Sequence, residues 1–165
     1  MKIRKLVLAL VVAGLAATGL ASPQAQAGGI NGAITFAGGA VYDTNSLATA
    51  TRVNAFSHVT VMSGDGDFAG LVGAPVTMAT PYIFVPSTPT PALWSVGGFT
   101  FDLANSVVVL QNASFLLITA SGTITGNGFD ATPGTVSFTR PSPAAKGLSA
   151  TAGGSSAQCA PKGRA

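Results

Sequence analysis

The stretch Phe99-Thr100-Phe101-Asp102-Leu103 alternates large apolar residues with small polar or charged ones. Successive side chains of a β-strand point to opposite faces, so this period of two predicts a half-buried strand with Phe99, Phe101 and Leu103 inward. Two apolar runs follow at 107–110 and 115–118. The Gln111-Asn112-Ala113-Ser114 stretch between them has the length and composition of a hairpin connection. The centre of the chain therefore predicts consecutive antiparallel strands.

The same kind of pattern continues on both sides of this stretch. Short runs of Val, Ile, Thr and Phe are interrupted by Gly, Pro, Asn or Asp, and the interruptions recur about every 8–12 residues, a spacing typical of antiparallel sandwiches. We expect one all-β domain over 28–140, an antiparallel β-sandwich of Greek-key or jelly-roll type with roughly nine to eleven strands. The proline-rich segment Pro86–Pro91 predicts a loop that crosses from one part of the sheet system to another.

The first 27 residues have the pattern of a secretory signal peptide. Lys2, Arg4 and Lys5 precede a 15-residue run of Leu, Val, Ala, Gly and one Thr, and Ala25-Gln26-Ala27 is a small-x-small cleavage site. A helix of that length rises only about 22 Å, less than the roughly 30 Å of a bilayer core. We therefore expect cleavage after Ala27, export by a Sec-type route, and a secreted, extracellular protein with no membrane segment after cleavage.

The C-terminal residues 141–165 differ in kind from the body. Eighteen of these 25 residues are Ala, Gly, Ser or Pro, and Leu148 is the only large aliphatic residue. Such a composition buries too little apolar surface to offset the entropy of ordering, so we expect a disordered tail. The lone Cys159 lies in this tail. Pairing with another chain and a free thiol both remain open for it.

Composition excludes several function classes. The formal net charge of +3 is carried entirely by the signal peptide, because the rest of the chain has five basic residues and five aspartates. Within it, residues 28–140 contain two arginines against the five aspartates and total −3. A body of that charge has no basic stripe for phosphates, so we expect no nucleic-acid partner. One His and one Cys cannot build a multi-ligand zinc site or an internal disulfide framework.

No motif assigns a catalytic or cofactor-binding residue, and we expect neither a catalytic centre nor a cofactor. Gly126–Ala131 has the residue spacing of a dinucleotide-binding fingerprint but not its structural context, because Pro133 blocks the helix that must follow. We interpret this segment as a turn. Asp65-Gly66-Asp67-Phe68-Ala69-Gly70 resembles the opening of a calcium loop, which makes Asp65 and Asp67 weak calcium candidates. A hairpin turn is the favoured interpretation, since Val76 stands where a bidentate Glu is needed.

Two further sets of residues suggest alternative functions. Trp94, with Tyr82, is a candidate for stacking on a sugar ring in a carbohydrate-binding module, although a core position is the commoner role of a single Trp. His58 with an aspartate is a candidate for a secreted hydrolase. The neighbours Val59 and Val61 favour instead a strand residue that faces solvent or pairs across strands.

Three segments carry a resemblance to a known family: Gly66–Ala69, Leu93–Leu103 and Gly128–Thr139. In these segments the body resembles short exported proteins of Gram-negative bacteria that carry the PEP-CTERM sorting signal. The resemblance implies association with the cell surface or exopolysaccharide and no catalytic residues. The signal itself is missing or degenerate here, since no Glu and no apolar run follow Phe138.

Together these observations predict a non-enzymatic exported protein, a cell-surface or extracellular-matrix component that associates with extracellular polysaccharide. A carbohydrate-binding module built on Trp94 is the first alternative, and a secreted hydrolase is the second. Low charge and many strand-forming segments also leave self-association through sheet edges open.

Overall fold

The computed structural model describes residues 27–141 and 147–152. The predicted signal peptide before Ala27 and the tail residues 142–146 and 153–165, Cys159 included, lie outside the described residues. Nine strands and two short 3-10 helices form the described part. In chain order they are β1 (Gly32–Tyr42), η1 (Leu47–Thr49), β2 (Arg52–Gly64), η2 (Gly66–Leu71), β3 (Thr77–Met78), β4 (Tyr82–Ile83), β5 (Thr90–Val96), β6 (Phe99–Gln111), β7 (Phe115–Gly126), β8 (Phe129–Pro141) and β9 (Gly147–Ala152).

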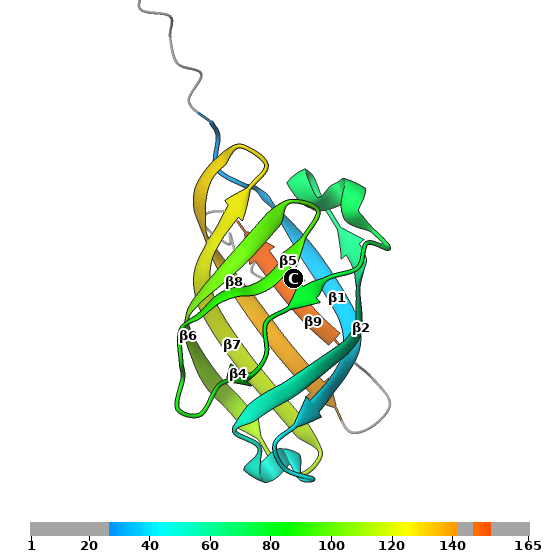
Figure 1. Ribbon diagram of the computed structural model, residues 1–165, viewed down its shortest axis with the longest axis vertical. Helices are drawn as coiled ribbons and strands as arrows, with labels where there is room; N and C mark the ends of the chain where they lie inside the picture. The colour runs from blue at the N-terminus through cyan, green and yellow to red at the C-terminus, as the bar shows by residue number, and fades with distance from the viewer. Residues whose placement is uncertain (1–26, 142–146, 153–165) are drawn as a thin grey trace, which may run out of the picture.

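All neighbouring strands are antiparallel, in the order β3-β5-β6-β7-β8-β9-β1-β2-β4. The sheet folds over into two layers that pack face to face, with β2 and β5 in front of β7, β8 and β9 in Figure 1. The predicted all-β antiparallel sandwich is confirmed. Within that class, β5 to β9 are consecutive neighbours rather than strands in the crossed Greek-key or jelly-roll order, because short connections join each to the next.

The two layers are joined at both ends of the strand order. Residues just before β3 hydrogen-bond to β2, where Val76 N donates to Val59 O at 2.8 Å. On the other side, Ser106 N of β6 donates to Ser87 Oγ at 2.7 Å. Ser87 lies in the predicted proline-rich crossing, which leads from β4 beside β2 to β5 beside β6. The crossing is confirmed for residues 86–89, whereas Thr90 and Pro91 of the predicted loop already belong to β5.

The alternation in the sequence separates the inner from the outer face of each strand. Phe99, Phe101 and Leu103 are buried as predicted, whereas Thr100 and Asp102 are not. The 111–114 hairpin is also confirmed, since Asn112 N donates to Phe115 O. Edge-to-face and stacked aromatic rings fill the centre of the core.

Strand β9 contradicts part of the predicted disorder of the tail. Gly147–Ala152 pairs with β8 on one side and with β1 on the other. The prediction of disorder was wrong for these six residues because it weighed only apolar surface. A segment between two strands also gains backbone hydrogen bonds along both of its edges, whatever its side chains bury.

Candidate functional site

The two candidate stacking residues lie in the core. Trp94 is 0% exposed and Tyr82 is 2% exposed. Trp94 stacks on Phe101, with ring centroids 5.8 Å apart, and meets Phe36 edge to face at 5.3 Å. Neither Trp94 nor Tyr82 presents a ring face to a ligand, so the proposal that they stack on a sugar was wrong. Period-two alternation places Trp94 on the same face as the buried Val96, and that signal favoured the core.

Asp65 and Asp67 hold the start of the first strand. Asp65 Oδ1 accepts a hydrogen bond from Ala33 N at 2.6 Å, and Asp67 Oδ2 accepts one from Asn31 N at 2.7 Å. The segment forms the 3-10 helix η2 rather than the predicted hairpin turn. The two carboxylates therefore serve as backbone acceptors. No three His, Cys, Asp or Glu side chains gather into a possible metal site anywhere in the described ranges.

Two other aspartates have a similar role. Asp43 accepts hydrogen bonds from the hydroxyl and the amide of Thr51, and these bonds hold the pKa of its carboxyl below the ordinary value. Asp102 Oδ1 accepts a bond from Ala92 N at 2.7 Å, where β5 is irregular and Ala92 has a φ of 48°. These carboxylates stabilise turns and bulges at separate places and do not form an acid–base pair.

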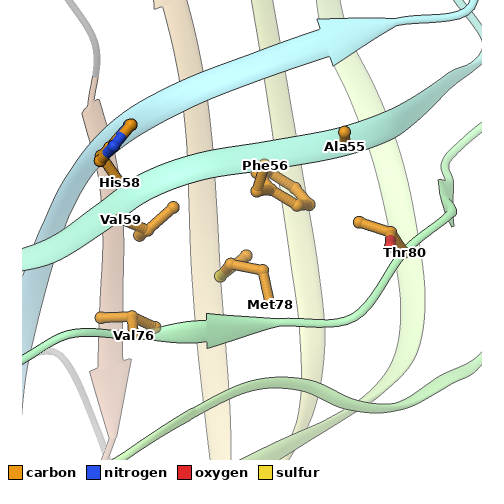
Figure 2. A pocket seen from close by; sticks show the side chains of 7 residues that line it. All are labelled: Ala55, Phe56, His58, Val59, Val76, Met78 and Thr80. Carbon is orange, nitrogen blue, oxygen red and sulfur yellow. The ribbon is translucent and has the colours of Figure 1, made fainter.

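A small cavity lies between β2 and β3, beyond the point where Val76 N donates to Val59 O. It has a volume of about 170 Å³. The chain after Val76 leaves β2 and rejoins it only at β4. Figure 2 shows Phe56, Val59 and Met78 between the two strands, with Thr80 at one end. The complete lining is Ala55, Phe56, His58, Val59, Val76, Met78 and Thr80, which includes no carboxylate.

His58 is exposed, as predicted for a strand residue that faces solvent. Its φ of 50° coincides with an irregular register between β1 and β2. The imidazole is turned to the side of β2 away from Met78 and Thr80 (Figure 2). No carboxylate accompanies His58 in the cavity lining, so the structure does not assemble the His–Asp pair that a hydrolase would need.

One half-buried polar cluster was not found from the sequence. Arg140 lies over the ring of Tyr42, 5.7 Å from its centroid, and donates from Nη1 to Ala40 O at 3.3 Å. Burial raises the pKa of Tyr42 to about 12, although the charge of Arg140 opposes the shift. The Tyr42 hydroxyl has no hydrogen-bond partner within the described part of the chain.

The outward face of β7 and β8 carries hydroxyl residues that sequence analysis did not single out. Thr119, Ser121 and Thr135 are exposed, and they alternate with the buried residues Ala120 and Val136. The sequence signal that could have indicated this face is the alternation of Thr and Ser with apolar residues in both strands. This face combines hydroxyl groups with an absence of formal charge.

No family model, no curated protein and no solved structure matches the chain. Within residues 27–141 and 147–152, no helix has the length and apolarity needed to cross a bilayer.

Proposed function

We propose that this chain is a non-enzymatic exported protein, a component of the cell surface or of the extracellular matrix that associates with exopolysaccharide. One observation carries the proposal: the outer face of β7 and β8 is neutral and presents the hydroxyls of Thr119, Ser121 and Thr135. Such a face can exchange hydrogen bonds with a hydrated, uncharged polymer and does not require the burial of a charge.

The arrangement of the acidic groups supports a structural role. Asp65, Asp67 and Asp102 each accept a hydrogen bond from a backbone amide through one carboxylate oxygen. Acid–base or nucleophilic catalysis needs such groups to converge on one reacting atom. In this fold they hold the start of β1 and the irregular part of β5 at separate places.

Export and matrix association are tested by expressing the full chain with its own leader in a Gram-negative host that makes exopolysaccharide. We expect the processed chain in the matrix fraction and its release when the polysaccharide is digested. A matched chain lacking residues 2–27 should stay in the cytoplasm. Retention of the full chain in the cytoplasm, or equal release with and without digestion, would contradict the proposal.

A further inference from the structure

The register of the sheet aligns hydroxyl residues from five neighbouring strands. Thr119 of β7 is the partner of Ser137 of β8, and Thr35 of β1 is the partner of Ser63 of β2. Ser149 of β9 connects these two pairs, because it is the partner of both Ser137 and Thr35. We call this set the first hydroxyl row.

A second hydroxyl row runs beside the first. Ser121 of β7 is the partner of Thr135 of β8, and Thr135 is the partner of Thr151 of β9. Each member stands two residues along its strand from a member of the first row, and therefore on the same face. Strands lie about 4.8 Å apart and every second residue is about 6.8 Å along, so the two rows define a regular grid.

The described side chains of this grid point outward. Thr119, Ser121, Thr135 and Ser63 are exposed, and Ser137 is half-buried. The hydroxyls of Thr35 and Ser63 hydrogen-bond to each other, which confirms that neighbouring members of the first row meet on one face. Ser149 and Thr151 belong to the grid by their register positions in β9.

No member of the grid is charged. Asp65 borders it, since its carboxylate accepts a hydrogen bond from the amide of Ala33, the register partner of Thr151. The other charged residues with described positions stand elsewhere: Asp43 and Arg52 beside the β1–β2 connection, Asp67 at η2, His58 on β2, Asp102 on β6, and Asp130 and Arg140 near the ends of β8. The large apolar side chains that are exposed in the described ranges are all aliphatic. A ligand of this face is thus recognised by hydroxyl groups, not by ion pairs or by aromatic stacking.

We propose that the two hydroxyl rows bind an uncharged polysaccharide chain that lies across β7, β8, β9, β1 and β2. The inference rests on the proposed function and names its binding face. A polymer with hydroxyl and ring oxygens repeated along its length can meet successive strands of the grid, which a small solute cannot do. Each hydrogen bond to the polymer replaces a hydrogen bond to water and therefore adds little binding free energy. Binding thus depends on many contacts along one polymer. Residues 28–140 total −3 and the three basic residues of the tail bring the processed chain to zero, so no net positive charge attracts an anionic polymer.

The test is affinity electrophoresis and sedimentation of the processed chain with cellulose, a β-1,3-glucan and dextran as neutral probes and alginate as the anionic probe. We expect retention by at least one neutral probe and none by alginate. The double variant Thr119→Val/Thr135→Val keeps strand-forming side chains and removes one hydroxyl from each row. It should weaken retention about tenfold, as two lost hydrogen bonds imply.

Two matched variants control this result. Thr119→Ser/Thr135→Ser restores both hydroxyls and should bind like the parent, and Thr77→Val removes an exposed hydroxyl from β3, outside the rows. If the valine variant misfolds, Thr119→Lys/Thr135→Lys should remain folded and abolish neutral binding. Unchanged binding of the valine and lysine variants, equal loss in Thr77→Val, or retention by alginate alone would overturn the inference. Failure to bind any neutral probe would also overturn it, whereas a chain that still fractionates with the matrix would leave the proposed function standing.

Discussion

Replacing Asp67 by Ala separates the backbone-acceptor role of this carboxylate from a calcium-binding role. In the structure Asp67 Oδ2 accepts a hydrogen bond from Asn31 N at 2.7 Å, at an exposed position. A hydrogen bond to a charged group contributes about 1.5–3 kcal/mol when it is protected, and less where water can replace the acceptor. We therefore expect Asp67→Ala to lower the free energy of unfolding by about 1 kcal/mol. With a urea m-value near 2 kcal/mol/M, the midpoint falls by about 0.5 M.

Urea unfolding followed by the fluorescence of the buried Trp94 measures this shift, with 5 mM calcium or EDTA in parallel. Asp130→Ala is the matched control, because Asp130 is an exposed acid whose carboxylate makes no hydrogen bond with the described residues. Calcium at one hundred times its dissociation constant would add about 2.7 kcal/mol of stability. Such a gain in the parent, lost in Asp67→Ala, would refute the backbone-acceptor reasoning; equal midpoints with calcium and EDTA are expected.

Two further predictions concern the raised pKa of Tyr42 and the close packing around Gly122. The pKa of Tyr42 is raised from 10.0 to about 12, so its contribution to stability is complete below pH 10 and is lost as the pH rises toward 12. Tyr42→Phe should flatten that loss in equilibrium unfolding, apart from the share of Tyr82, whose pKa is also raised by burial. A Cβ on Gly122 would collide with the backbone oxygen of Asp102, so Gly122→Ala should lower the melting temperature by several degrees. Gly70→Ala, with open space around it, should leave the melting temperature nearly unchanged.

The fold class could be predicted because alternation reports burial directly. In β6, Phe99, Phe101 and Leu103 face the core and their neighbours do not, as the period of two requires. Alternation does not predict β9, because its small residues carry little apolar signal. Its strand conformation comes from two partner ladders far away in the sequence, and local composition does not describe those partners.

The candidate site was harder to predict because it depends on register. Thr35 and Ser149 come from opposite ends of the chain and become partners only through the β1–β9 pairing. Bulges shift the register within β6 and β7, and one residue of slip would turn Thr119 inward. Trp94 shows the reverse case, since an isolated aromatic residue suits both a core and a stacking platform until its neighbours are known.

Truncation tests whether β9 holds the two halves of the sheet together. A chain ending at Pro141 would lose β9 and leave the edges of β8 and β1 without their common partner. At about 0.5–1.5 kcal/mol for each backbone hydrogen bond, two lost ladders amount to several kcal/mol, a large share of the usual 5–15 kcal/mol total.

The exposed edges would also pair between molecules, because unpaired donors and acceptors of a strand recruit another chain. We expect the chain ending at Pro141 to aggregate in size-exclusion chromatography with light scattering, and the matched chain ending at Ala152, which keeps every described strand, to remain in solution. A monomeric, cooperatively unfolding chain without residues 142–165 would show that β1 and β8 need no strand between them. The first hydroxyl row would then lose its continuity as well, since Ser149 is the only register link from Ser137 to Thr35.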